Sequence, residues 1–513
     1  MFAEMAATAT DKSHTKKIAA ALIVRLLMSS WVTAGHLTSG HGRAKETSSM
    51  QRLSGLDAFF LNLESPTQPL NICCVLEMDP ATMPGGYTFN RFQEALSVRL
   101  NAVPEFRLKL ADNELNFDHP VWVDDDRFDL SRHLHRVALP SPGGPKELAD
   151  ICGHVAGLAL DRDRPLWEMW VIEGLHGTDA LSVVLKVHHA VVDGVGGANL
   201  LAQLCSAVPD AAPPKPAVRI GAANPLQIAA SGLIGAALRP WRLAKVVPST
   251  ALTLAQTVLR ARSGGQTMAA PFAAPQTAFN GTFTPRRNVA LTSVDLEDVK
   301  TVKRRFGVTV NDVVTAVCAG ALRQYLQDRD ALSDLPLVAS VPVSVRDQST
   351  RAGRNQMTWM LCRLETHIND PGERLASIAR ANAAAKDHSA AMGPTLLHDW
   401  TQVAGQTMFG AARKLLPRIP LPDKPPHNLV MSNVAGPQEQ LYFLGCRLDA
   451  MYPLGPIIAG AALNITVMSL NGRLGVGIVS CPDLVPDLWD VADAFPAALK
   501  QLLNCGEHAH GPR

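Results

Sequence analysis

The sequence predicts a mixed α/β (α+β) fold of two similar-sized domains joined by a helical crossover segment. Three observations support this prediction. The chain has 513 residues, which is too long for one ordinary hydrophobic core. From residue 53 onward, short apolar runs typical of strands alternate with stripes of helical period. A stretch with four prolines at 209–216 interrupts this pattern and opens a basic and apolar segment that reaches about residue 274.

These features divide the chain into five parts. We predict an N-terminal domain over 50–208, a partly helical crossover over 209–279 and a C-terminal domain over 280–505. An extension at 1–49 and a tail at 506–513 flank them.

The extension differs in composition from the rest of the chain. Lys16-Lys17 precede the apolar stretch 18–32, as in a signal peptide, but Arg25 interrupts that stretch. Patterned sequence begins directly after Met50. We therefore expect residues 1–49 to be a disordered extension or to lie upstream of the true start, rather than to act as a signal or anchor.

The N-terminal domain is predicted to contain at least three strands and two helices. Apolar runs predict strands at Ile72 to Met78, Leu166 to Ile172 and Leu181 to Val187. Behind a possible N-cap at Thr88, one helical face is formed by Phe89, Phe92, Leu96, Leu100 and Val103. The glycine-rich stretch 194–197 leads into a second helix near Ala198 to Val208.

The C-terminal domain repeats the mixed pattern. Behind the possible cap Thr309, a helical stripe is formed by Val310, Val313, Val317, Ala321 and Tyr325. Residues 372–420 are Ala-rich and predicted to be helical. Strands are predicted at Leu337 to Val345, Asn428 to Ser432, Leu463 to Met468 and Leu474 to Val479.

Composition excludes several classes of protein. The net charge is +2 with both signs interspersed, which argues against a nucleic-acid partner. Hydrophobic residues make up 47% of the chain, but no apolar run reaches the length of about 20 residues that crosses a bilayer. The nine cysteines are scattered without zinc-site spacing, which indicates a reducing compartment and no structural metal. The adjacent pair Cys73-Cys74 is interpreted as core filler rather than a redox site.

The crossover contains a candidate contact surface for lipid. Within 217–262, basic residues interleave with apolar ones as in an interfacial helix. The apolar set is Leu233, Ile234, Leu238, Trp241 and Leu243, and the basic set is Arg239, Arg242 and Lys245. The alternative is a helix packed across the domain junction with its charges in water, and the sequence leaves both interpretations open.

Chemistry is indicated by the stretch His188-His189-Ala190-Val191-Val192-Asp193-Gly194 at the end of a predicted strand. Transfer of an acyl group from a thioester to an alcohol needs a base that removes the hydroxyl proton, and the near-neutral pKa of histidine suits this role. Asp193 four residues after His189 can hold the turn, and Gly194 permits close approach. No Gly-x-Ser-x-Gly nucleophile elbow occurs, so direct transfer without an acyl-enzyme is expected.

Several further stretches, taken together, carry a family resemblance. They are Leu53-Ser54-Gly55-Leu56-Asp57-Ala58-Phe59-Phe60, Pro165-Leu166-Trp167, Val310-Asn311-Asp312-Val313, Pro342-Val343-Ser344-Val345-Arg346 and Ser432-Asn433-Val434-Ala435-Gly436-Pro437. With the HHxxxDG stretch, the chain from Leu53 to about Leu488 resembles the bacterial wax ester synthase/diacylglycerol acyltransferase family. The resemblance implies two chloramphenicol acetyltransferase-like domains, with a channel between them where acyl-CoA meets the acceptor alcohol.

The resemblance also implies roles for His189 and Asp193, and the chemistry of the residue types suggests roles for the others. His189 is the expected general base, and Asp193 is chiefly structural. We expect His188 to pack or to hydrogen-bond to the backbone. Asn311 and Asp312 either cap a helix or contribute to the site. Arg346 is a candidate ion-pair partner of Asp193, because a buried carboxylate needs one.

The expected activity is acyl-CoA-dependent formation of triacylglycerol from diacylglycerol, with wax esters from fatty alcohols as a further product. Acyl-CoA is a co-substrate, and no cofactor or metal is expected. The expected location is the cytoplasm, with peripheral contact at the inner membrane face or at lipid droplets. The sequence departs from the family pattern at Ala435, usually proline, and at Arg354, which separates Gly353 from Asn355-Gln356. Both departures bear on acceptor preference.

Three alternatives remain open from the residues alone. A condensation-type domain shares HHxxxDG but acts on amines, and the five parts predicted within residues 1–513 include no carrier or adenylation domain. Plant acyltransferases share the motif as well, but their Asp-Phe-Gly-Trp-Gly stretch is missing here. A lipid-binding protein on the same scaffold is the non-enzymatic alternative.

Overall fold

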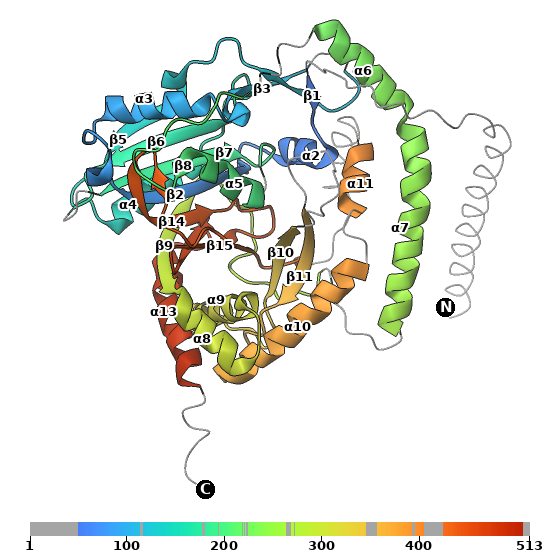
Figure 1. Ribbon diagram of the computed structural model, residues 1–513. Helices are drawn as coiled ribbons and strands as arrows, with labels where there is room; N and C mark the ends of the chain where they lie inside the picture. Colours follow the sequence, from blue (N-terminus) through green and yellow to red (C-terminus); the bar gives the residue numbers. More distant parts are fainter. Residues whose placement is uncertain are drawn as a thin grey trace, which may run out of the picture. The chain divides into compact units, whose positions relative to one another are not determined.

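The computed structural model describes residues 50–112, 116–176, 180–192, 194–217, 219, 221, 224–262, 268–270, 272–344, 357–391, 396–404 and 424–505. The predicted extension at 1–49 and tail at 506–513 lie outside these residues. Figure 1 shows two sheets with helices packed on them, so the predicted mixed α/β fold is confirmed.

A seven-stranded sheet forms the first half of the fold, and its order is β5-β6-β7-β2-β14-β13-β8. All neighbours are antiparallel except β5 and β6. The strands are β2 (Asn71–Asp79), β5 (Leu134–Ala138), β6 (Trp167–Glu173), β7 (Leu181–His188), β8 (Cys205–Ser206), β13 (Tyr442–Phe443) and β14 (Cys446–Leu454). The three strands predicted here are confirmed as β2, β6 and β7.

Four helices and a small sheet accompany these strands. The helices are α2 (Gly55–Leu63), α3 (Phe89–Leu100), α4 (Pro145–Gly157) and α5 (Gly194–Leu204), and the small sheet joins β1 (Gln51–Arg52), β3 (Leu108–Ala111) and β4 (Val121–Asp124). Thr88 caps α3 as predicted, accepting a hydrogen bond from the Arg91 N–H. Val103 is buried but lies beyond the end of α3, so its assignment to that helix was wrong.

Helix α5 begins and ends four residues earlier than predicted. Its predicted end at Val208 is wrong because Cys205 and Ser206 leave the helix to pair with Phe443 and Tyr442 of β13. This pairing joins residues more than 230 positions apart, so local periodicity carries no signal for it.

A six-stranded sheet forms the second half, in the order β11-β10-β12-β15-β16-β9. The β10–β12 and β12–β15 pairs are parallel and the others antiparallel. The strands are β9 (Asn288–Asp295), β10 (Val338–Ser344), β11 (Met357–Arg363), β12 (Leu429–Val434), β15 (Leu463–Leu470) and β16 (Arg473–Ser480). The predicted strands are confirmed as β10, β12, β15 and β16.

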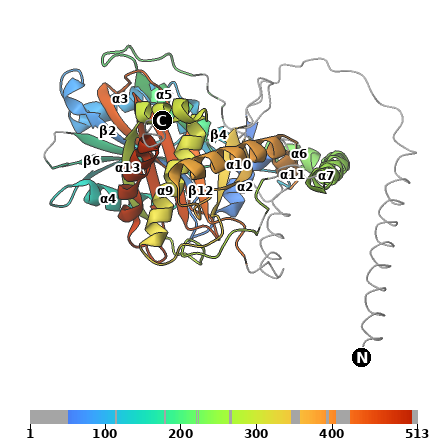
Figure 2. The same ribbon diagram turned by 90° about the horizontal axis from the view of Figure 1, so that it is seen from below.

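Helices α9 (Val310–Gln327), α10 (Pro371–Ala391) and α13 (Leu488–Asn504) pack on this sheet (Figure 2), with α8 (Leu296–Phe306) beside α9. The predicted stripe on α9 faces a second hydrophobic core, and Val313, Val317 and Tyr325 are buried there. Thr309 and Asp312 form the capping box of α9. The helical prediction for 372–420 is confirmed for α10 and α11 (Leu396–Val403), while its remainder lies outside the described residues.

Strand β14 links the two halves. It comes from the predicted C-terminal domain yet pairs with β2 of the first sheet. A Cβ at Gly475 or Gly477 would lie 2.0 Å from the carbonyl oxygens of Met451 and Pro453, so these glycines let β14 pass directly against β16. The domain boundary at residue 280 stays a prediction. One strand from beyond that boundary, β14, belongs to the sheet of the first half.

The crossover contains two helices, α6 (Pro225–Ala237) and α7 (Arg239–Arg262). Among the described residues, no single helix combines the length and apolar composition of a membrane span, although α8 and α9 meet those criteria jointly across a bend of 106°.

Candidate active site

The two histidines of the motif stand where β7 ends. Strand β7 is buried along its whole length and pairs with β2 on one side and β6 on the other. His188 is its last residue, and a turn follows in which the Val191 N–H donates to the His188 carbonyl (2.9 Å). The His189 N–H donates to the Leu70 carbonyl (2.8 Å). These hydrogen bonds fix the backbone of the motif where it continues beyond the end of β7.

Helix α2 supplies the surface on which His189 rests. The rings of His189 and Phe60 are stacked, with centroids 3.9 Å apart and planes inclined by 10°. Ser54 and Asp57 form a capping box that fixes the start of α2. Gly55 allows α11 to approach, because a Cβ there would lie 2.2 Å from backbone atoms of α11. The opening stretch Leu53 to Phe60 thus places Phe60 against His189.

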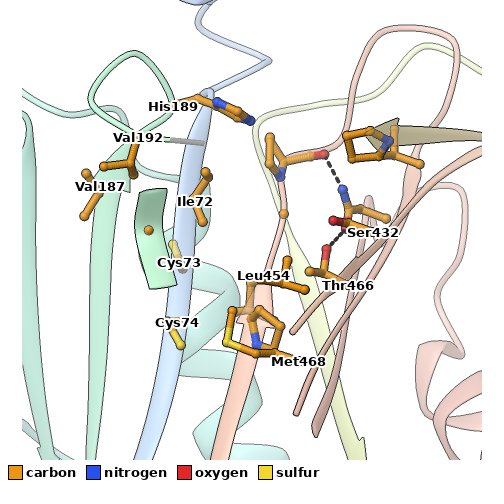
Figure 3. A pocket seen from close by; sticks show the side chains of 18 of the residues that line it. Ile72, Cys73, Cys74, Val187, His189, Val192, Ser432, Leu454, Thr466 and Met468 are labelled. Atoms are coloured by element: carbon orange, nitrogen blue, oxygen red, sulfur yellow. Dashed lines mark hydrogen bonds between the residues drawn. The ribbon is translucent and has the colours of Figure 1, made fainter. Parts of the chain in front are cut away.

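His189 lies at a pocket of about 190 Å³ whose walls come from both sheets. Figure 3 shows His189 at one end, with Ile72 and Cys73 of the first sheet on one wall and Ser432 and Thr466 of the second sheet on the other. Most of the lining is apolar; the first half contributes Phe60, Leu70, Ile72, Cys73, Cys74, Leu185, Val187, Val192, Gly197, Leu200 and Leu201. The second half contributes Pro342, Met357, Trp359, Val430, Val434 and Met468, and the lining also includes Leu454 at the end of β14 and Ile458 after it. Such a pocket suits a hydrocarbon chain.

A few polar side chains line the same pocket from the second half: Ser344, Ser432, Asn433, Asn464 and Thr466. Asn464 is held by two hydrogen bonds, since its Nδ2 donates to the Pro456 carbonyl (2.9 Å) and its Oδ1 accepts from Thr466 (2.7 Å). Convergent polar groups in an apolar pocket orient a bound ligand.

Asn311 and Asp312 lie behind this wall rather than in it. Asn433 Nδ2 reaches Asn311 Oδ1 at 3.5 Å, so Asn311 is one residue removed from the pocket. Asp312 Oδ2 accepts from the Thr309 N–H and hydroxyl, and its Oδ1 accepts from Asn382 Nδ2 (2.9 Å). These contacts account for Asp312 as a capping residue that ties α9 to α10.

His188 faces away from the pocket lining. Its Nδ1 accepts a hydrogen bond from the Ala190 N–H (3.0 Å), and its Nε2 lies 3.4 Å from Glu64 Oε1. Its side chain is 1% exposed. Burial and these contacts give His188 no direct approach to a ligand in the pocket.

The remaining predicted site residues are only partly covered by the structure. Gly194 is the first residue of α5. Asp193, Arg346 and Arg354 lie outside the described residues, so the supporting role of Asp193 and its pairing with Arg346 stay predictions. Ala435 directly follows β12 and is exposed, outside the pocket lining.

Burial disfavours the thiolate form of the two pocket cysteines, Cys73 and Cys74. Burial raises the pKa of Cys73 to about 12 and that of Cys74 further still. Both cysteines are unbonded, and the thiolate is the nucleophilic form. Among the described residues, no group of three or more His, Cys, Asp or Glu side chains is arranged to hold a metal ion.

Sequence reasoning missed three of the residues that shape the site. The sequence indicates Phe60 only as part of a matching stretch, and it gives no signal for Trp359, whose ring meets Phe60 edge-on with centroids 6.4 Å apart. Glu64 was also missed. Its position gave a signal, because a carboxylate at the C-terminus of a helix opposes the helix dipole and needs a reason.

Comparison with known proteins finds matches over most of the chain. Residues 53–314 match the wax ester synthase/diacylglycerol acyltransferase catalytic domain, and residues 354–503 match the C-terminal domain of the same family. A putative diacylglycerol O-acyltransferase of Mycobacterium tuberculosis is 65% identical over 458 residues, covering 89% of this chain and 91% of the relative. A probable diacylglycerol O-acyltransferase of the same species is 36% identical, covering 87% and 97%.

Solved structures show the same fold. The wax ester synthase/diacylglycerol acyltransferase of Marinobacter aquaeolei VT8 is 29% identical with a TM-score of 0.62, covering 88% of this chain and 98% of that one. The first condensation domain of the calcium-dependent antibiotic synthetase is 15% identical with a TM-score of 0.54, covering 89% and 97%, and shares the fold alone. With both family domains matched and curated relatives similar over most of its length, this chain is an acyltransferase that belongs to the wax ester synthase/diacylglycerol acyltransferase family.

Proposed function

We propose that this protein transfers a long-chain acyl group from acyl-CoA to the hydroxyl of diacylglycerol, giving triacylglycerol, with fatty alcohols as alternative acceptors. The observation that carries the proposal is the position of His189 at the end of an apolar pocket built from both halves. The names of the mycobacterial relatives support diacylglycerol as the acceptor.

His189 acts as the general base in this proposal. Its imidazole takes the proton from the acceptor hydroxyl as the oxygen attacks the thioester carbonyl. The tetrahedral intermediate then collapses, the C–S bond breaks, and the CoA thiolate leaves with the proton returned by the imidazolium. Direct transfer is favoured over an acyl-enzyme on Cys73 or Cys74, because the raised pKa of both thiols leaves them protonated.

A lipid surface is the proposed source of the acceptor, and α6 and α7 are the proposed contact. Residues 225–262 contain five basic and no acidic side chains. Leu226, Ile234 and Trp241 are 74%, 63% and 61% exposed, and they lie on two consecutive helices rather than singly over the surface. Basic charge beside exposed apolar side chains favours binding to an anionic lipid interface. The corresponding location is the inner membrane face or lipid droplets of the cytoplasm, where acyl-CoA is available.

The packing of α6 explains why Leu226, Leu233 and Ile234 point outward, whereas Ile228 is buried against the small sheet. Its inner face contains Gly232 and Gly235, where a Cβ would lie 2.3 Å from Asn116 Oδ1 and 1.9 Å from Asp118 Oδ2. Only the glycine face fits against this polar loop. The opposite face, with Leu226 and Ile234, is left exposed.

The experiment that tests the activity mixes the purified full chain with a long-chain acyl-CoA and one of three acceptors: diacylglycerol, a fatty alcohol or a long-chain amine. Thiol release and the lipid product are followed together. Release that depends on an alcohol, with triacylglycerol or wax ester as product, is expected. An amide product would instead favour condensation-type chemistry, and lipid binding without acceptor-dependent release would favour a binding protein.

A further inference from the structure

The carboxylate of Glu64 connects three segments around the two histidines. Glu64 is the C-cap residue of α2, and its side chain is 8% exposed. Its Oε1 lies 3.4 Å from His188 Nε2 and accepts a hydrogen bond from the Leu70 N–H (3.2 Å). Its Oε2 accepts from Arg162 Nε (3.2 Å) and Nη2 (2.7 Å).

The first connection places the carboxylate beside the protonated nitrogen of His188. Because Nδ1 accepts a hydrogen bond from the Ala190 N–H, it carries no proton. The proton of the neutral ring is therefore on Nε2, the nitrogen that faces Glu64. Nε2 makes no hydrogen bond in this geometry, so the carboxylate favours this tautomer through its negative charge at 3.4 Å. The ring in turn holds the amide that follows His189.

The second connection runs from Glu64 through Leu70 to the backbone N–H of His189. The Leu70 N–H donates to Glu64, and the Leu70 carbonyl accepts from the His189 N–H (2.8 Å). The peptide groups on both sides of His189 are thus held by groups that contact Glu64. The same helix, α2, also places Phe60 against the His189 ring.

The stability of α2 does not explain why a glutamate stands at position 64. A carboxylate at the end of α2 faces the negative end of the helix dipole. Burial of its charge adds a desolvation cost, which its contacts must offset. Arg162, its basic partner, is 47% exposed and also donates to the Leu61 carbonyl, so this guanidinium has water and a backbone acceptor without Glu64. The position of Glu64 is therefore explained by its contacts with His188 and Leu70.

We propose that Glu64 is a positioning residue for acyl transfer, which fixes the backbone on both sides of His189 and favours this tautomer of His188. This rests on the proposed role of His189 as the base. Displacement of a catalytic base by about 1 Å can lower the reaction rate by up to about 10²-fold. Because loss of Glu64 would allow such a displacement of His189, we expect it to lower kcat. Substrate binding in the apolar pocket, and therefore KM, is unaffected.

Three variants separate the positioning role from a packing role. Glu64→Leu removes both oxygens while keeping similar volume, and we expect kcat to fall by about 10- to 10²-fold with KM unchanged. Glu64→Gln keeps an oxygen for Leu70 and His188 and is expected to restore most of kcat. Glu173→Leu removes another partly buried carboxylate with an arginine partner, Arg136 at 2.8 Å, away from the pocket, and is expected to leave kcat unchanged. Rates are expressed per folded molecule from thermal melting, and Glu64→Ala replaces Glu64→Leu if the latter does not fold.

A double-mutant cycle gives the decisive result. If Glu64 acts through His189, Glu64→Leu lowers kcat in the wild-type background and has no further effect in His189→Ala. Equal proportional losses in both backgrounds, an unchanged kcat in Glu64→Leu, or the same loss in Glu64→Gln as in Glu64→Leu would overturn the inference. Failure of the proposed function is distinguishable, because His189→Ala by itself would then leave the rate unchanged.

Discussion

The rings of His189 and Phe60 are stacked with centroids 3.9 Å apart and planes only 10° apart. The imidazole of the proposed base therefore has one face covered by a side chain from α2. This contact restricts rotation of the ring, so the direction of its nitrogens is defined before a substrate binds.

Replacement of Phe60 tests the value of this restriction. Phe60→Leu keeps an apolar side chain but removes the flat partner of the imidazole, and we expect kcat to fall by about 10-fold, within the range that misplacement of a catalytic group produces. Phe128→Leu is the matched control, since the Phe128 ring also stacks on a histidine, His133, and both lie outside the lining of the His189 pocket. A rate in Phe60→Leu equal to that of the control would contradict the positional role of the stack.

The pocket wall formed by β2 is expected to select the length of the acyl or acceptor chain. Cys74 is partly buried and lines the pocket. Cys74→Phe places a ring there and is expected to shift preference toward shorter chains, measured as kcat/KM over a series of acyl-CoA lengths. Cys74→Ala leaves the space open and should keep the original preference. The same length profile in both variants would show that the chain lies elsewhere.

The ionisation of Glu64 predicts a pH dependence of stability. Burial raises its pKa, but the contacts with His188, Arg162 and the Leu70 amide together lower the pKa from 4.5 to about 2. Because the folded-state pKa is lower than the unfolded one, the ionised group stabilises the fold above pH 4.5, and this contribution is lost as the pH falls toward about 2.

Urea unfolding of the wild type and Glu64→Gln measures this contribution. The difference in unfolding free energy should be largest at neutral pH and should shrink as the pH falls through the window between the two pKa values. A difference that stays constant across that window would mean that the Glu64 carboxylate is not preferentially ionised in the folded state.

The exposed side chains of α6 and α7 predict lipid binding. Leu233→Ser, Ile234→Ser and Trp241→Ser combined should reduce co-sedimentation with vesicles of phosphatidylcholine and phosphatidylglycerol, because they remove the apolar part of the contact. Leu335→Ser is the control, since Leu335 is also exposed but lies outside the crossover. Undiminished sedimentation of the triple variant would exclude these helices as the contact.

Charge reversal at Arg242 and Lys245 tests the electrostatic part of the same contact. Arg239 is unsuitable for this purpose, because it lies 3.6 Å from Asp118 and donates to the Phe117 carbonyl, so its loss would disturb the packing of the crossover. Reversal at the other two positions should weaken binding to anionic vesicles and have little effect with neutral ones.

The sequence predicted most elements because hydrophobic period reports which residues face a core. It predicted His189 at a strand end, where β7 indeed stops. The period of hydrophobic residues does not indicate which strand pairs with which. It therefore could not predict that β14 joins the first sheet or that β8 pairs with β13. Phe60 and Glu64 were missed for a related reason: their roles depend on contacts with residues more than 120 positions away in the chain.

The most direct test of the account is the rate of thiol release by His189→Ala with acyl-CoA and diacylglycerol. Loss of a general base lowers kcat by about 10²-fold or more, and we predict a decrease of that size with the fold intact. A rate equal to that of the wild type would contradict the assignment of His189 as the base.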